Sequence, residues 1–326
     1  MDSTKQADLP FVSVISLNWN GRHFLEKLLP SLEAQTYPKD RFEIIILDNN
    51  STLDDSVEFV AKNFPDVHLI KNQRNDGFAK GCNLAMAEAK GDYFLLVNND
   101  TVAAKDWLKT IVGSATSNEH TGAVVSKVLF ANRGGGKIIN NAGSTLYPDR
   151  AWPVEEIGAN KPDGPEYSKP REITALCGTS LLLSRPMLDD IGLFDESFFM
   201  YFEDTDLSWR GQKAGWKFYY CPDSIILHEH SGSSKEHSDF WTFYVTRNRL
   251  LVMFKHASLL LALRVYLGFL RDFIIIPTIR GLQGRERRQQ LRTFKLGLRI
   301  NFSFWWKTTE ALLKRFHLMR ERQLSK

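Results

Sequence analysis

The sequence predicts an α/β fold built on an open sheet of parallel strands, and three observations support this prediction. Short apolar runs without polar alternation, at residues 11–17, 43–47, 67–70 and 93–97, are typical of strands covered on both faces. Helical patterns separate these runs, at residues 24–32, about 54–63 and about 78–89. Polar, turn-forming residues follow every run. The order βαβαβαβ therefore opens a sheet that helices flank on both sides.

Length and composition indicate a globular protein. The chain has 326 residues, of which 43% are hydrophobic, so it can bury a sizeable core. Cys82, Cys177 and Cys221 are far apart and lack the spacing of a zinc site or a disulfide framework. The polar N-terminus MDSTKQADLP has no apolar signal core. We therefore expect a protein of the reducing cytoplasm.

The net charge of +4 hides an uneven distribution. Residues 251–326 hold 16 Lys and Arg against 4 Asp and Glu, which leaves residues 1–250 with a net charge of −8. An acidic body suits a site that holds a cation, whereas a basic tail with many apolar residues suits an anionic surface.

The polar residues after the four strands are the first candidate site. The ends are Asn18, Trp19 and Asn20; Asp48 to Ser51; Asn72 to Gly77; and Asn98, Asn99 and Asp100. A turn explains any one of them, but the carboxyl ends of parallel strands meet at one edge of the sheet, where ligands bind. No GxGxxG follows the first strand and no GxxxxGK[ST] is present, so the usual phosphate-binding loops are excluded. A divalent cation, Mg²⁺ or Mn²⁺, is the expected substitute for neutralising phosphates.

An acidic cluster stands at a predicted helix start. Glu203, Asp204 and Asp206 follow the aromatic stretch FFMYF. Acidic residues stabilise the first turn of a helix, so a purely structural role for these three acids stays open. An apolar wall also raises a carboxylate pKa and strengthens the group as a base, so we favour a functional role.

Further candidates lie downstream. The loop-rich residues 131–170 precede a strand at 175–185, and a strand at 224–228 ends in His228, near His230. A strand-end His is commonly a surface residue, yet neutral imidazole can also complete a metal shell. The Gly and Ser of 231–234 offer backbone N–H groups to a phosphate, and Arg247 offers a fork for a diphosphate.

Seven motifs, in order, resemble one known family. VSVISLNWNG, ILDNNST, NDGFAKGCN, LLVNNDT, FFMYFEDTDLSWR, HEHSGSS and FYVTRNRLL are similar to those of family 2 inverting glycosyltransferases, in particular the bacterial rhamnosyltransferase-like branch, over about residues 11–251. The resemblance implies a GT-A fold, a Rossmann-like mixed sheet flanked by helices, with a C-terminal helical extension. It implies a catalytic domain at 1–250, with a donor half at about 11–130 and an acceptor half at about 131–250.

The resemblance also implies a role for individual residues. Asp204 takes the place of the general base, with Glu203 and Asp206 as supporting acids. Asp100 and His228 become metal ligands, although Asn98 replaces the first acid of the family's Asp-x-Asp motif and puts the strength of metal binding in doubt. The segment 75–79 would shape the base and ribose pocket. The residues that would bind the donor are Asn18, Asn20, Asp48, Asn50, Asn75, Gly77, Phe78, Asn99 and Arg247.

Residues 251–326 form a basic, amphipathic, helical region. Arg264, Arg271 and Asp272 interrupt its most hydrophobic part, so it is a poor transmembrane span. FKLGLRINFSFWWK (294–307) has the composition of a helix that lies in a membrane interface. Packing on the catalytic body or on a second subunit, as in a homo-oligomer, is the alternative. Nucleic acid is not expected as a partner, because long aliphatic residues interleave the basic ones.

The leading hypothesis is a metal-dependent inverting glycosyltransferase. It would move a sugar, by resemblance rhamnose from a dTDP or UDP donor, to a glycan or polyprenyl-linked acceptor in cell-surface polysaccharide synthesis, at the inner face of the cell membrane. The alternative is a catalytically silent nucleotide-sugar binding or scaffolding protein with the same fold, because fold alone does not establish activity.

Overall fold

The chain folds into two compact units. The computed structural model describes residues 9–229 and 238–324, with side chains described as far as residue 310. Within these described residues, the first unit comprises 9–146 and 154–229, and the second unit comprises 147–153 and 238–324. The predicted functional boundary at residue 250 therefore falls inside helix α8 (Asp239–His256) of the second unit.

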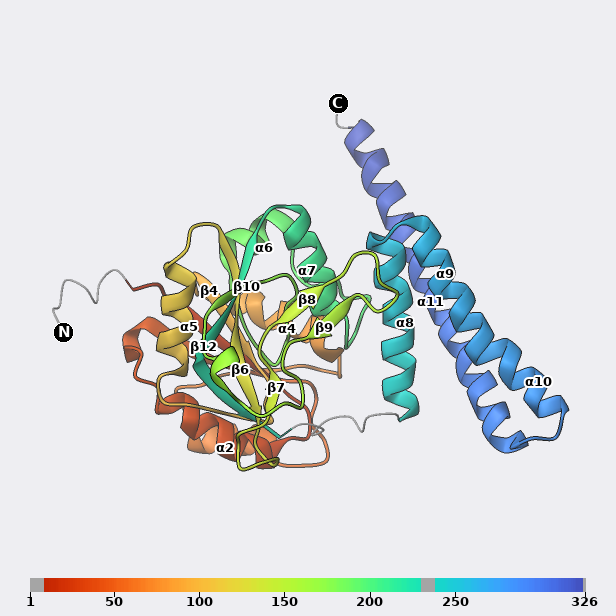
Figure 1. Ribbon diagram of the computed structural model, residues 1–326. Coiled ribbons are helices and arrows are strands. Elements are labelled where there is room, and N and C mark those ends of the chain that lie inside the picture. Colours follow the sequence, from red (N-terminus) through yellow and green to blue (C-terminus); the bar gives the residue numbers. More distant parts are fainter. Residues whose placement is uncertain (1–8, 230–237, 325–326) are drawn as a thin grey trace. The chain divides into compact units, whose positions relative to one another are not determined.

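A mixed sheet forms the centre of the first unit (Figure 1). Strands β3, β2, β1 and β4 are parallel neighbours in that order, and the sheet continues through β11, β6, β12 and β10. The strand β11 runs antiparallel to β4 and β6, whereas β6 and β12 are parallel. The main bounds are β1 Val12–Asn18, β2 Phe42–Asp48, β3 His68–Lys71, β4 Tyr93–Val97, β6 Thr121–Phe130, β10 Arg171–Ile173, β11 Ser180–Ser184 and β12 Lys217–His228. The predicted mixed α/β sheet with flanking helices is confirmed.

Alternate residues of each strand face two separate cores. On one face, Val14 of β1 packs with the apolar sides of α2 (Arg22–Glu33), α3 (Ser56–Asn63) and α5 (Trp107–Thr116). On the other, Ile15 packs with α4 (Gly77–Glu88), α6 (Arg185–Ile191) and α7 (Glu203–Lys213). This division follows from the two-residue period of a strand and holds the carboxyl ends of the strands rigidly at one edge.

The strand β6 is an element that the sequence analysis did not predict. All ten of its residues are buried, but Ser126 and Lys127 interrupt the apolar run. Ser126 Oγ accepts a hydrogen bond from Trp107 Nε1 at 3.0 Å, and Lys127 Nζ lies 3.1 Å from Asp163 Oδ1. Tertiary partners thus satisfy two polar residues in the middle of a sheet.

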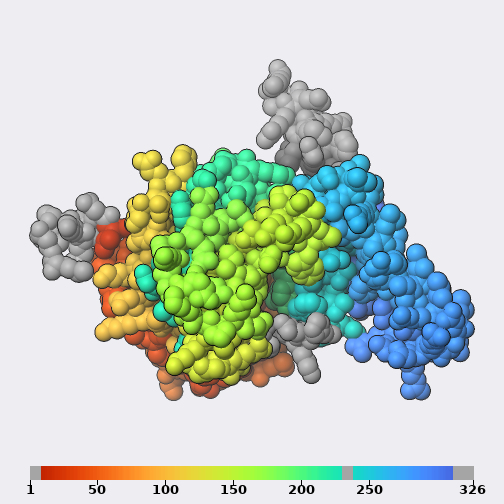
Figure 2. Space-filling model, viewed as in Figure 1, coloured from red at the N-terminus to blue at the C-terminus, as the bar shows by residue number. Residues whose placement is uncertain are grey.

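The loop-rich residues 131–170 contain short elements. Strand β7 (Ile139–Asn141) pairs with β6, and β8 (Ser144–Leu146) pairs with β9 (Val154–Glu156) in a separate two-stranded sheet. A 3₁₀ turn covers Pro165–Tyr167. In Figure 2 the yellow-green surface of the first unit comes from residues 131–170. Outside this range, the short strand β5 (Thr101–Ala103) pairs with β12.

The second unit is helical, which confirms the predicted C-terminal helical extension. After α8 come α9 (Leu259–Leu270), a π-helical turn at Arg271–Ile275, α10 (Ile276–Leu282) and the long α11 (Arg287–Leu324). Hydroxyls of Ser238 and Ser258 cap the first two helices. Among the described residues, no helix is both long and apolar enough to cross a membrane.

Candidate active site

Asn18 joins the ends of three strands. Its Nδ2 donates to Asp48 Oδ1 at 2.9 Å, and its Oδ1 accepts from Asn99 Nδ2 at 3.1 Å, so the ends of β1, β2 and β4 meet through one buried carboxamide. Asp48 also accepts hydrogen bonds from the Ser51 N–H (2.8 Å) and hydroxyl (2.5 Å). Three predicted donor-binding residues therefore form one network at the sheet edge.

Asn20 shapes the loop after β2. Its Oδ1 accepts hydrogen bonds from the N–H groups of Thr52 and Leu53, both at 2.9 Å. Asn20 and Asn50 both adopt positive φ, of 51° and 64°, which Asn tolerates better than most residues. Asn50 is exposed. Trp19 lies between Asn18 and Asn20 in the sequence and is 47% exposed, although it was not among the predicted donor-binding residues.

The start of α4 is tied to the aromatic stretch before α7. Asn75 Oδ1 accepts from the Gly77 N–H at 2.9 Å, and Gly77 has a φ of 78°. The carbonyl of Phe199 accepts from the N–H groups of Phe78 (2.6 Å) and Ala79 (3.2 Å), which are orphan donors of the first helical turn. The predicted pocket segment 75–79 is thus held by the segment that precedes the acidic cluster.

Asp100 and His228 form the predicted metal pair. Strand β5 brings them together, because Thr101 pairs with His228, and Asp100 Oδ1 lies 3.2 Å from His228 Nε2. Both side chains are only 8% exposed. Asn140 Oδ1 lies 2.9 Å from His228 Nδ1, and because an amide oxygen can only accept, Nδ1 carries the proton. The other ring nitrogen, Nε2, therefore faces the Asp100 carboxylate.

This pair fits a divalent cation. The buried Asp100 Oδ1 lies 3.2 Å from His228 Nε2, so a carboxylate oxygen and an imidazole nitrogen, both groups that ligate metals in proteins, lie side by side. Among the described residues there is no group of three or more His, Cys, Asp and Glu side chains that could hold a metal alone. Mg²⁺ commonly takes one or two carboxylates and completes its shell with substrate phosphates. Asn98 offers no carboxylate, and Asn99 is turned toward Asn18.

Glu203 and Asp204 begin α7 as an adjacent pair of acids. Asp204 is partly exposed; its Oδ1 accepts from the Thr205 N–H at 2.7 Å and its Oδ2 from the Gly178 N–H at 3.2 Å. Burial raises the pKa of Asp204, although these N–H groups favour the charged form. Glu203 is buried, and its Oε2 accepts no hydrogen bond from any described residue. Burial and the neighbouring Asp204 raise the pKa of Glu203 well above its usual range.

Asp206 has a structural role. It is fully buried and pairs with Arg210, whose Nε lies 2.8 Å from Asp206 Oδ2. Arg210 in turn donates to the carbonyls of Ile191, Gly192 and Leu193. Asp206 therefore anchors the turn after α6, and its support of the base stays a prediction.

The backbone before the acids is strained. Phe199, Tyr201 and Phe202 all have positive φ, of 63°, 69° and 69°. This conformation costs an aromatic residue on the order of 1–3 kcal/mol, and such residues cluster at functional sites. The strained turn is what aims the Phe199 carbonyl at α4 and starts α7 at Glu203.

Comparison with known proteins identifies the family. A family model described as glycosyl transferase family 2 matches residues 13–192, more than half of the chain. The chain belongs to glycosyl transferase family 2.

Several characterised and solved proteins are similar to this family 2 chain. An N-acetylglucosaminyl-diphospho-decaprenol L-rhamnosyltransferase of Mycobacterium tuberculosis is 25% identical over 249 residues, which cover 68% of this chain and 76% of that protein. The O-antigen biosynthesis protein RfbC of Myxococcus xanthus is 28% identical over 248 residues, covering 72% of this chain but 19% of that protein. These relatives support the predicted family and its rhamnosyltransferase-like branch.

Solved structures confirm the GT-A glycosyltransferase fold. GalNAc-T7 with UDP, GalNAc and Mn²⁺ matches with a TM-score of 0.60 at 18% identity, over 76% of this chain and 48% of that chain. A mannosyltransferase of Pyrobaculum calidifontis with GDP-Man and Mn²⁺ matches with a TM-score of 0.56 at 16% identity, over 92% of this chain and 88% of that chain.

Arg247 belongs to the second unit of this family 2 protein. It is buried in α8, where its Nε donates to Asn248 Oδ1 at 2.8 Å and its guanidinium lies over the rings of Phe243 and Tyr244. Burial lowers the pKa of Arg247 to about 10, so the side chain stays charged at neutral pH. Its contact with a donor diphosphate stays a prediction. His230 and the 231–234 segment lie outside the described residues.

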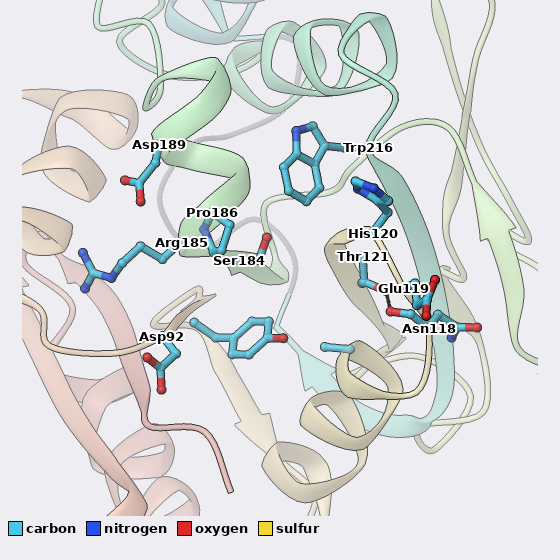
Figure 3. A pocket seen from close by; sticks show the side chains of 12 residues that line it. Asp92, Asn118, Glu119, His120, Thr121, Ser184, Arg185, Pro186, Asp189 and Trp216 are labelled. Carbon is cyan, nitrogen blue, oxygen red and sulfur yellow. Dashed lines mark hydrogen bonds between the residues drawn. The ribbon is translucent and has the colours of Figure 1, made fainter. Parts of the chain in front are cut away.

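A cavity of about 640 Å³ lies away from these residues (Figure 3). Asp92, Arg185, His120 and Trp216 line it, next to the first residues of β4 and β6. Asp100 follows the carboxyl end of β4, so the cavity opens at the opposite edge of the sheet. The Arg185 guanidinium already donates to the carbonyls of Gly91 and Ala89. We therefore assign the cavity no part in the candidate active site.

Proposed function

We propose that this chain is a metal-dependent inverting glycosyltransferase. It transfers a rhamnose-like sugar from a dTDP or UDP donor to a glycan or lipid-linked acceptor in bacterial cell-surface polysaccharide synthesis. The relation to a decaprenol-linked rhamnosyltransferase supports the sugar and the acceptor class. The three cysteines are free thiols, which supports a cytoplasmic enzyme. We place it at the inner face of the membrane, where a lipid-linked acceptor would lie.

Asp204 is the observation that carries the proposal. A partly exposed carboxylate that is fixed by two backbone N–H groups, and whose pKa burial raises, has the properties of a general base. In a single displacement it accepts the proton of the acceptor hydroxyl, as that oxygen bonds to the anomeric carbon and the nucleoside diphosphate departs from the opposite face. Asp204 thereby becomes protonated, and the pair of bonding electrons leaves with the diphosphate.

The other residues bind and position the donor. The network of Asn18, Asp48 and Asn99 fixes the edge on which we place the nucleoside, and Asn20 fixes the loop beside it. Asn50, Asn75, Gly77 and Phe78 complete this pocket. Asp100 and His228 would hold Mg²⁺ or Mn²⁺, which supplies positive charge for the departing diphosphate. Arg247 would add a second positive charge there, and Glu203 supports Asp204 from the buried side.

The test separates binding from turnover. Asp204→Asn should lower transfer by roughly 10²–10⁴-fold, the usual contribution of a general base, while the Kd for the sugar nucleotide with Mn²⁺ changes little. Transfer is measured as nucleoside diphosphate release across a panel of sugar nucleotides, and binding by calorimetry. Asp66→Asn, which changes an exposed acid outside the candidate active site, is the matched control.

Two results would count against the proposal. Equal loss of binding and turnover in Asp204→Asn would refute its role as base. If the protein binds a sugar nucleotide but releases no diphosphate with any acceptor tested, the catalytically silent binding protein is the correct interpretation.

A further inference from the structure

The helix α9 carries an exposed apolar stripe. Leu260, Leu263 and Leu267 follow one another at spacings of three and four residues, which places them on one side of the helix. Leu260 is 81% exposed, and exposed apolar residues continue with Ile275 in the π-helical turn and with Ile279 and Leu282 in α10. In Figure 2 the outer surface of these helices, in blue, is open to view on the face shown.

The helix α11 carries a second such stripe with aromatic residues. Leu291, Leu298, Phe302 and Trp306 recur at spacings of seven, four and four residues. Phe302 and Trp306 are 72% and 64% exposed, and their rings stack with centroids 6.3 Å apart. Two large aromatic side chains stacked in contact with water are a costly arrangement for a surface that stays uncovered.

The opposite side of the same helices is well packed. Phe304 is fully buried, and its ring lies against Phe254 and Tyr266. The Tyr266 hydroxyl donates to Asn301 Oδ1 at 2.8 Å and accepts from Trp305 Nε1 at 2.9 Å. The helices of the second unit therefore already pack against one another through these buried residues. The exposed apolar stripes take no part in that packing.

Basic side chains flank the apolar stripe of α11. Arg288, Arg292, Lys295 and Arg299 recur at spacings of four, three and four, roughly a quarter turn around the helix from Leu291 and Leu298. All four are exposed. On α9, Arg264 stands next to Leu263. Among the described residues, Arg264, Arg288 and Lys295 form no ion pair, so their charges are available to an anionic partner.

We infer that α9, α10 and α11 form a docking surface for an anionic lipid bilayer, in which the apolar stripes enter the interface and the basic flank meets the lipid phosphates. Helices with one apolar and one basic flank, and with Trp and Phe among the apolar residues, lie in the headgroup region without crossing the bilayer. The inference concerns a surface of the second unit and does not depend on the proposed transfer reaction.

Charge decides between a bilayer and a second copy of the chain. Residues 251–326 carry a net charge of +12, so two copies that paired through this surface would bring their basic flanks together. Like charges opposed in an interface cost several kcal/mol. An anionic membrane has the complementary charge, and each Lys or Arg near its surface strengthens binding about fivefold, the equivalent of about 1 kcal/mol.

The experiment uses the full chain and vesicles of defined composition. Flotation compares neutral phosphatidylcholine vesicles with vesicles containing phosphatidylglycerol, at low and high salt. We expect binding to the anionic vesicles that weakens with salt. Phe302→Ser with Trp306→Ser should lower the partition coefficient at least tenfold, and Arg264→Gln with Arg288→Gln by roughly 25-fold.

Matched controls lie on the first unit. Leu193→Ser replaces another exposed apolar residue and Lys109→Gln another exposed basic residue, and both should leave vesicle binding unchanged. Circular dichroism and thermal unfolding establish that each variant is folded. The inference is overturned if folded wild-type protein does not float with anionic vesicles, or floats equally with neutral ones. It is also overturned if sedimentation shows a dimer that Phe302→Ser with Trp306→Ser dissociates.

Discussion

Asn140 offers the sharpest test of the metal site, because it touches the proposed ligand and not the metal. Its Oδ1 lies 2.9 Å from His228 Nδ1 and fixes the tautomer in which Nε2 faces Asp100. Removing a hydrogen-bond partner of this kind from a metal-binding His typically costs 10–100-fold in metal affinity. We therefore expect Asn140→Ala to weaken Mn²⁺ binding by about 10–100-fold, or about 1.4–2.7 kcal/mol.

The assay is calorimetric titration of Mn²⁺ into protein saturated with UDP and, in a separate series, with dTDP. Asn140→Asp keeps an oxygen acceptor at the same place, so it should hold the same tautomer and retain affinity within about threefold. Asn118→Ala, an exposed Asn at the opposite edge of the sheet, is the matched control and should behave as wild type.

Unchanged Mn²⁺ affinity in Asn140→Ala would refute this reasoning. His228→Ala then shows where the error lies. If it also leaves the affinity unchanged, His228 is not a ligand. If it abolishes binding, His228 is a ligand whose orientation does not depend on Asn140.

Two further predictions concern the base and the start of α4. Burial raises the pKa of Asp204, and the base acts as its carboxylate, so turnover should rise with pH through an ionisation above the ordinary range near 4. The pH profile of kcat/KM at saturating metal measures this ionisation for Asp204 and Glu203 as a pair. A profile in which kcat/KM falls only at or below pH 4 would contradict the prediction. Gly77→Ala should destabilise the protein by about 1–3 kcal/mol, seen as a lower Tm, because φ is 78° and the new Cβ would lie 2.4 Å from the Phe199 carbonyl oxygen. Gly113→Ala, with open space around its Cβ, is the control, and an equal Tm for both variants would refute the argument.

Local patterns predicted the first half of the sheet well. The runs that became β1, β2, β3 and β4 are continuous and apolar, and the polar residues after them lie at one edge because parallel strands point the same way. The joining of Asn18, Asp48 and Asn99 follows from that geometry. For most of these strands and the helices between them, the observed first and last residues differ from the predicted ones by one or two positions.

In the second half of the sheet, the strands predicted at 175–185 and 224–228 correspond to β11 and to the end of β12, but β6 and β7 escaped prediction because tertiary contacts supply what the local sequence lacks. Ser126 and Lys127 break the apolar pattern of β6, and partners distant in sequence make them acceptable in a core. Ser126 bonds with Trp107, Ser180 and Ser224, and Lys127 pairs with Asp163. Asn140 lies in a stretch that resembles a loop, and pairing of β7 with β6 carries it to His228.

The sequence by itself determined the parallel opening of the sheet, its polar edge, the acidic cluster at the start of α7 and the basic, apolar character of the C-terminal helices. These features depend on local periodicity and composition, which a single chain displays. Only the tertiary structure decided the partners of individual side chains. It paired Asp206 with Arg210, it set Asp100 against His228, and it divided the exposed from the buried sides of α11. Such pairings depend on residues far apart in the chain, and no local pattern records them.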